Sequence, residues 1–125
     1  MNRVLIVDDQ PRFQRHLRRL LRRAGLTVVG EARSIAEAAG VIEEQAPDLA
    51  VVDVMLPGVS GLAGTPRLKA LVPGLRVILV SAHRDRAELF KAAAAEAGAE
   101  VFFAKDDLDL AVVRAWVDRG PAAEA

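Results

Sequence analysis

Short apolar runs alternate along the chain with longer segments in which apolar residues recur every three or four positions. Runs rich in Val, Ile, Leu and Ala predict β-strands, and the longer periodic segments predict helices. The expected strands occupy residues 4–7, 27–32, 49–53, 76–80 and 100–104. The runs at 4–7 and 49–52 are apolar throughout, which is typical of central strands buried on both faces.

The expected helices cover residues 11–24, 34–45, 65–71, 85–97 and 107–119. Pro11 suits the first turn of a helix, where its missing N–H costs nothing. Ser34, followed three residues later by a glutamate, forms a capping box that opens the second helix. Gly64 and Pro66 interrupt the third helical segment. We therefore expect regular helix to begin near Thr65, or to kink there.

Strand and helix alternate five times with short connections. This order predicts an α/β fold, a doubly wound five-stranded parallel sheet with helices on both faces. At 125 residues the chain is long enough for one domain with a buried core, which we place at residues 1–119. Residues 120–125 are expected to be a C-terminal tail or the stub of a linker.

Composition narrows the classes of function. Seventeen Lys and Arg balance seventeen Asp and Glu, so no global field draws the chain to nucleic acid or to a membrane surface. The absence of Cys excludes disulfides and thiolate metal sites, and two histidines, His16 and His83, are too few to suggest a zinc site. No apolar run is long enough for a signal peptide or a membrane span, so we expect a soluble, cytoplasmic domain.

Four of the expected strands end in residues with polar side chains. Asp8 and Asp9 follow the first strand, Asp53 ends the third, Ser81 follows the fourth and Lys105 follows the fifth. Because the carboxyl ends of parallel strands meet at one edge of a sheet, we expect these side chains to converge. Asp53 alone would be explained as well by a turn or a helix cap, and it is the other residues that favour a shared site.

The chemistry of this set is specific. Three neighbouring carboxylates repel one another unless a cation joins them. Oxygen ligands of this kind suit Mg²⁺, which is commonly held by one or two carboxylates and a phosphate. A hydroxyl and an ammonium group nearby would stabilise a phosphoryl group. The set therefore predicts attack of the Asp53 carboxylate on phosphorus, which leaves an aspartyl phosphate.

Over residues 3–119 the chain resembles the receiver domains of two-component response regulators. The resemblance rests on the acidic pair Asp8 and Asp9, on Asp53 followed by Pro57 and Gly61, on Ser81 followed by Ala82, and on Lys105. It implies the flavodoxin-like strand order 2-1-3-4-5. Asp106 directly after the lysine, together with residues 71–77, resembles the subgroup that carries a LuxR-type helix-turn-helix output domain.

In that family the residue at the Asp53 position accepts a phosphoryl group from the phosphohistidine of a sensor histidine kinase or a phosphotransfer protein. The resemblance implies a Mg²⁺ site with these ligands: Asp8, Asp9, Asp53 and the main-chain carbonyl of Met55. It implies that Ser81 and Lys105 stabilise the phosphoryl group. Regulation of transcription would then require a DNA-binding output domain absent from this chain, and a homodimer is also compatible with the family.

The resemblance also implies a switch made by Ser81 and Phe102. When the hydroxyl moves the aromatic side chain turns inward, and the surface of the fourth helix, fifth strand and fifth helix changes. Alternation along the strand places Phe102 and Phe103 on opposite faces, and we expect Phe102 to be the mobile one. Met55 and His83 occupy positions at which side chains in the family modulate the lifetime of the phosphoryl group.

The leading hypothesis is a signalling receiver that takes part in its own phosphorylation and dephosphorylation, not an enzyme. A receiver-like interaction module that is independent of phosphorylation is the main alternative. A hydrolase that forms an aspartyl phosphate is a third, although Met55 stands where such enzymes carry a second Asp. The six arginines between Arg12 and Arg23 form either a solvated face or a docking face for an acidic kinase or phosphotransfer partner.

Overall fold

The computed structural model describes residues 2–117. Its strands are β1 Arg3–Val7, β2 Thr27–Ala32, β3 Leu49–Asp53, β4 Arg76–Ser81 and β5 Val101–Ala104. Its helices are α1 Pro11–Arg23, α2 Ile35–Gln45, α3 Gly61–Leu71, α4 Ala87–Ala97 and α5 Leu110–Val117. Two short 3₁₀ turns, η1 Arg84–Arg86 and η2 Lys105–Asp107, precede α4 and α5. The predicted tail at residues 120–125 lies outside the described residues.

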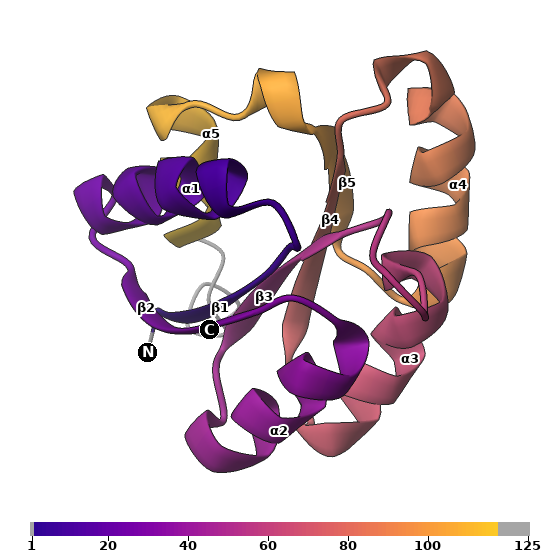
Figure 1. Cartoon of the computed structure of the whole chain (residues 1–125). Coiled ribbons are helices and arrows are strands. Elements are labelled where there is room, and N and C mark those ends of the chain that lie inside the picture. The colour runs from indigo at the N-terminus through magenta and orange to yellow at the C-terminus, as the bar shows by residue number, and fades with distance from the viewer. Residues whose placement is uncertain (1, 118–125) are drawn as a thin grey trace, which may run out of the picture.

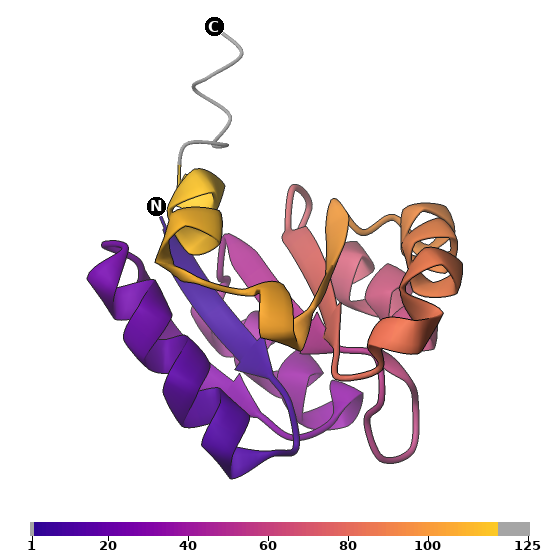
Figure 2. The ribbon, with the colours of Figure 1, turned by 90° about the horizontal axis from the view of Figure 1, so that it is seen from above.

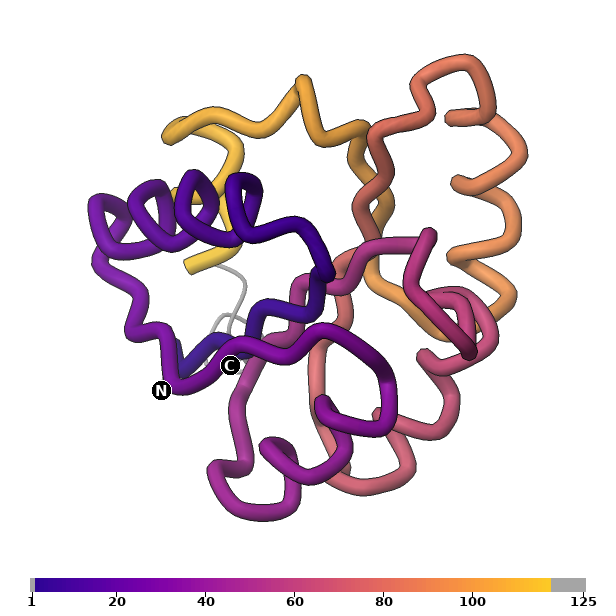
Figure 3. The backbone as a smooth tube through the Cα atoms, viewed as in Figure 1, coloured from indigo at the N-terminus to yellow at the C-terminus, as the bar shows by residue number. Residues whose placement is uncertain are grey.

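Within residues 2–117 the five strands form one parallel sheet in the order β2-β1-β3-β4-β5, which confirms the expected fold. Figure 1 shows α1 and α5 on one face of this sheet and α2, α3 and α4 on the other. The view from above in Figure 2 separates the same two layers. The tube in Figure 3 follows the chain from each strand into the next helix.

The sheet separates two hydrophobic cores, because successive residues of each strand point to opposite faces. Leu5 and Leu79 belong to the core beneath α2, α3 and α4. Their chain neighbours Ile6 and Ile78 belong to the core beneath α1 and α5. The apolar runs of the central strands are thus explained, since both of their faces are covered.

Phe102 and Phe103 in β5 follow the same alternation. Phe102 lies against Phe90 of α4, with ring centroids 5.7 Å apart. Phe103 lies against Trp116 of α5, with ring centroids 5.9 Å apart. The prediction that the two phenylalanines face opposite sides of the sheet is confirmed.

The start of α3 differs from the expectation. The helix begins at Gly61 and not near Thr65, and Pro66 lies inside it. Ser60 is the N-cap, and its hydroxyl accepts a hydrogen bond from the Ala63 N–H at 3.1 Å. This cap satisfies an otherwise unpaired N–H, so the helix forms before the proline although Pro66 removes one later helical bond.

Two glycines in the first turn of α3, Gly61 and the Gly64 that argued against an early helix start, are required by close packing. A Cβ atom on Gly61 would lie 2.2 Å from the main-chain oxygen of Asp53. A Cβ atom on Gly64 would lie 2.5 Å from side-chain carbons of Ile35 in α2. The first turn of α3 therefore passes directly over the end of β3 and against α2, which only glycine allows.

Two other helices begin later than expected. Regular helix in α4 begins at Ala87, after the η1 turn, and α5 begins at Leu110, after η2. The side chain of Asp109 accepts a hydrogen bond from the Val112 N–H at 2.9 Å, so the cap lies two residues after the predicted start at Asp107. The predicted end of this helix, Arg119, lies outside the described residues.

We expect Gly61→Ala to lower the free energy of unfolding by about 1–3 kcal/mol or more, because its methyl group meets main-chain atoms that cannot yield easily. Gly40→Ala is the matched control, since Gly40 lies in the interior of α2 with nothing within 4 Å of an added Cβ. It should instead raise the free energy of unfolding, by up to about 1 kcal/mol. Urea unfolding followed by the fluorescence of the single tryptophan measures both. Equal stability of Gly61→Ala and the wild type would contradict the close approach.

Candidate functional site

The carboxyl edge of the sheet gathers polar side chains from four neighbouring strands. Asp8 follows β1, Asp53 ends β3, Ser81 ends β4 and Lys105 follows β5. These strands are consecutive in the sheet, and their pairing keeps their carboxyl ends level. The four residues are buried, with exposed fractions of 1%, 4%, 0% and 9% in that order. The convergence predicted from the sequence is present, and it occurs in a largely water-excluded place.

Three carboxylates meet at this edge. Asp8, Asp9 and Asp53 each place a carboxylate oxygen within 4.8 Å of the other two. Asp8 and Asp53 are buried and Asp9 is partly exposed, so the group opens toward solvent on one side. Oxygen donors in such a group match the preference of a hard divalent cation.

The ammonium group of Lys105 lies among these carboxylates. Its Nζ is 2.7 Å from Asp8 Oδ2 and 3.3 Å from Asp53 Oδ2. It donates hydrogen bonds to Asp53 and, at 3.1 Å, to the side-chain oxygen of Gln10. The contact with Asp8 Oδ2 is an ion pair without the alignment of a hydrogen bond, so this buried oxygen has no aligned donor among residues 2–117. The carboxylate oxygens of this group can therefore bind a further cation.

The electrostatic balance at Asp53 is dominated by burial. Burial raises the pKa of Asp53 from its ordinary value of 3.8 to about 6, and the nearby charge of Asp8 acts in the same direction. The Lys105 ammonium and the Met55 N–H, 3.2 Å from Asp53 Oδ1, favour the carboxylate but do not outweigh the loss of solvent. Binding of a further cation nearby would consequently stabilise the ionised form of Asp53.

Ser81 and His83 form a tight turn at the end of β4. The Ser81 hydroxyl oxygen accepts a hydrogen bond from the His83 N–H at 3.0 Å. Its own proton has no acceptor among residues 2–117, so it can be donated into the site. The imidazole of His83 is exposed, and so is the side chain of Met55, at 51%. Both predicted lifetime-tuning residues thus lie at the rim, and neither side chain is part of the buried group.

Phe102 is buried beneath α4, with 5% of its surface exposed. A shallow groove of about 180 Å³ runs between α4 and β5 beside it, and Lys91, Ala95 and Glu100 are among its lining residues. The aromatic ring therefore occupies the inward position in this structure. The groove lies on the surface that was predicted to change.

Three residues of α1 and its entry that the sequence reasoning did not assign contribute to the site. The Gln10 N–H donates to Asp8 Oδ1 at 2.8 Å. The buried side chain of Gln14 donates to the main-chain oxygen of Asp8 at 2.5 Å. The Phe13 ring centroid lies 4.2 Å from Lys105 Nζ. The available signal was Gln14, a polar residue on the face of α1 that buries Leu17 and Leu21, whereas nothing local marks Gln10 or Phe13.

No helix in the described part of the chain is long and apolar enough to cross a membrane. The sequence matches the response regulator receiver domain family over residues 4–114. It is 34% identical over 117 residues to the transcriptional regulatory protein NarL of Mycobacterium tuberculosis, covering 93% of this chain and 53% of NarL. It is 32% identical over 103 residues to the chemotaxis protein CheY of Thermotoga maritima, covering 82% of this chain and 84% of CheY.

A solved structure agrees with these relatives. A LuxR-family two-component response regulator from Aurantimonas has a TM-score of 0.81 at 32% identity, covering 93% of this chain and 81% of that chain. The chain spans about half the length of the transcriptional regulators that it matches. With a family match over most of its length and relatives at 32–34% identity, this protein belongs to the receiver domains of two-component response regulators, which act in phosphorelay signal transduction.

Proposed function

We propose that Asp53 is the phosphoacceptor of this receiver and that its phosphorylation switches the surface formed by α4, β5 and α5. One observation carries the proposal. The Asp53 carboxylate lies at the end of a central strand, 3.3 Å from a buried ammonium and within a group of three carboxylates. Such a group has the charges needed on both sides of a transferring phosphoryl group.

The proposed reaction is a transfer from a phosphohistidine. A P–O bond forms to the Asp53 carboxylate as the P–N bond to the histidine breaks, and the bonding electron pair leaves with the imidazole nitrogen. Lys105, already at hydrogen-bonding distance from Asp53, would then pair with a phosphoryl oxygen. The Ser81 hydroxyl, with its proton free, would donate to another.

Asp8, Asp9, Asp53 and the main-chain carbonyl of Met55 are the residues that would hold Mg²⁺, which neutralises negative charge on the phosphoryl oxygens when it is bound. These oxygen ligands suit such an ion. Its oxygens are clustered, and the buried Asp8 Oδ2 lacks an aligned donor. The receiver thus takes part in its own phosphorylation, while the protein donor supplies the phosphoryl group.

The switch is proposed to combine Ser81 with Phe102. Because Phe102 already lies inward against Phe90, movement of the hydroxyl toward the phosphoryl group is proposed to change the packing of this buried ring and not to bring it in from solvent. Phosphorylation adds about −1.5 to −2 charge at neutral pH, enough to rearrange the neighbouring loops. Met55 and His83, at the rim, are proposed to influence how long the phosphoryl group survives.

The proposed partners are those typical of the receiver family. A sensor histidine kinase or phosphotransfer protein in the cytoplasm is the proposed donor. Because the matched transcriptional regulators are about twice as long as this chain, we infer that output is DNA binding by a further domain. A homodimer through the α4–β5–α5 surface is compatible with that output.

Incubation of the protein with acetyl phosphate and Mg²⁺ should add the mass of one phosphoryl group, read by intact mass spectrometry. Asp53→Asn should abolish the addition, because the nucleophilic oxygen is lost. Asp85→Asn, at an exposed carboxylate of η1, is the matched control and should retain it. A wild type that gains no phosphoryl group would instead support the phosphorylation-independent interaction module. Continued release of inorganic phosphate from a simple phosphate ester would favour the hydrolase.

Asp53→Asn should also make the metal-free protein more stable at neutral pH. A pKa raised by roughly two units, with the attraction of Lys105 already included, corresponds to at most about 3 kcal/mol of unfavourable ionisation, so we expect a gain of about 1–3 kcal/mol. Because the folded-state pKa of about 6 exceeds the unfolded-state value, protonated Asp53 favours folding, and this contribution is lost as the pH rises through 6.

The gain should therefore shrink as the pH is lowered and disappear below about pH 4. Urea unfolding at a series of pH values, followed by Trp116 fluorescence, measures it. Asp85→Asn should show no comparable pH-dependent gain. If Asp53→Asn were less stable than the wild type at neutral pH, attraction to Lys105 would outweigh burial, contrary to this account.

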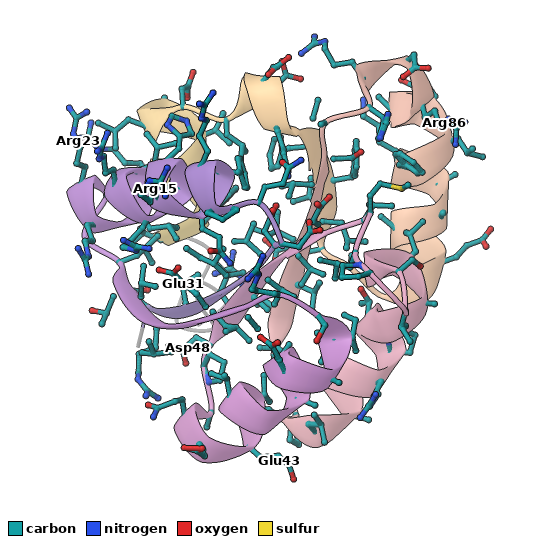
Figure 4. All side chains as sticks on the ribbon, viewed as in Figure 1. Arg15, Arg23, Glu31, Glu43, Asp48 and Arg86 are labelled. Atoms are coloured by element: carbon teal, nitrogen blue, oxygen red, sulfur yellow. The ribbon has the colours of Figure 1, made fainter. Side chains whose placement is uncertain are left out.

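The arginines of α1 provide a test of partner docking. Arg15 and Arg23 lie on the outer side of the helix (Figure 4), and Arg12, Arg19 and Arg22 are exposed as well. Arg15→Glu combined with Arg19→Glu should slow transfer from a phosphohistidine protein roughly tenfold or more at low salt, because steering of an acidic partner is lost. The defect should diminish as added salt screens the charges.

Arg67→Glu combined with Arg114→Glu makes the same change of net charge on exposed positions of α3 and α5 and is the matched control. It should leave transfer from the protein donor near the wild-type rate. Acetyl phosphate should modify both double variants equally well. No change in the α1 variant, or equal slowing of both, would show that its arginines are a solvated face.

A further inference from the structure

Lys105 is enclosed on two sides by groups of different character. Its Nζ faces Asp8, Asp53 and the side-chain oxygen of Gln10 on one side. The Phe13 ring lies on another side, with its centroid 4.2 Å from Nζ. Only 7% of the lysine side chain is exposed. The ammonium is thus held between two carboxylates, one neutral acceptor and an aromatic ring.

The aromatic ring attracts this ammonium group without adding negative charge, unlike a carboxylate. The face of an aromatic ring attracts a cation through its quadrupole, and the attraction grows where water is excluded. It adds no negative charge, so it does not compete with an incoming phosphoryl group for positive charge. A lysine side chain has four flexible carbons, and a fixed ring beside its end restricts the positions that Nζ can take.

The backbone fixes this ring relative to the carboxylates. Pro11 starts α1 only two residues after Asp9, which places Phe13 in the first helical turn. The Gln10 N–H is bonded to Asp8 Oδ1, and Gln14 is bonded to the main-chain oxygen of Asp8. The first turn of α1 is therefore tied to the strand end that carries the acidic residues. Phe13 also packs against the core beneath α1 and α5.

We propose that Phe13 is a positioning residue for phosphorylation of Asp53, which acts by holding the Lys105 ammonium beside the acceptor carboxylate. Because the ring is uncharged and packed on the core beneath α1 and α5, Nζ can pass from Asp53 to a phosphoryl oxygen while it stays against the ring. The inference rests on the proposed function of Asp53. It adds a role for an aromatic side chain that does not itself contact the reacting atoms.

The contact can be measured in the unphosphorylated, metal-free protein by NMR. The chain has three lysines, Lys69, Lys91 and Lys105, so ¹³C-labelled lysine gives few ε-methylene signals. A ring that faces the end of Lys105 should shield its ε-methylene protons and shift them upfield. Phe13→Leu should return that signal toward the other two, whereas Phe13→Tyr, which keeps a ring, should leave it shifted. Lys105→Arg assigns the signal by removing it.

The functional readout is the rate of phosphorylation by acetyl phosphate at saturating Mg²⁺. Phe13→Leu should lower the maximal rate roughly threefold to tenfold, in keeping with the strength of a partly desolvated cation–π contact. Phe13→Tyr should restore a rate near that of the wild type. Leu110→Ala removes apolar contact from the same core cluster on α5 and is the control for lost packing. It should reduce stability without slowing phosphorylation of the folded protein.

An upfield Lys105 signal that depends on a ring at position 13, together with a slower Phe13→Leu, would establish the role. A Lys105 signal that coincides with those of Lys69 and Lys91 would overturn it. A shifted signal with an unchanged rate in Phe13→Leu would also overturn it, because the contact would then be only structural. Failure of the wild type to accept a phosphoryl group would contradict the function of Asp53 itself, and it is recognised separately because the wild type is measured first.

Discussion

The burial of Asp8 and Asp53 side by side is the constraint on which the rest of the site depends. Two carboxylates at the ends of neighbouring central strands lose most of their solvent, and ionised Asp53 is destabilised as a result. Lys105 partly offsets this cost, but the pKa of Asp53 remains raised. The folded domain thus carries destabilised carboxylate charge at one edge of the sheet. A divalent cation that binds there would neutralise this charge, and the ligands are already in place in the folded protein.

The sequence was sufficient for the fold and for the members of the acidic group, because both depend on local patterns. Apolar runs give the strands, and the residue after each run falls at the carboxyl edge of the sheet. The resemblance then supplied the strand order. The start of α3 was predicted wrongly because Gly64 and Pro66 are residues typical of a loop or of a helix start. Gly64 is instead required by its contact with Ile35 of α2, which is visible only in three dimensions.

The same limit explains the residues around Lys105. Gln10 and Phe13 are ordinary residues for the beginning of an amphipathic helix, and they lie more than 90 positions away from the lysine that they contact. No spacing rule connects them. The two sides of helix α1 consequently differ: its first turn contacts the buried charges, and its outer surface carries the exposed arginines.

The aromatic pairs of β5 have a consequence for how an event at the site can be observed. Phe102 and Phe103 are adjacent in the chain but packed into different cores, against Phe90 and Trp116. The strand lies at the edge of the sheet, so β4 alone restrains it among the described strands. A tilt of β5 would therefore affect both aromatic pairs. Under the proposed switch at Phe102, the single tryptophan on the opposite face of the sheet would act as an intrinsic fluorescence reporter.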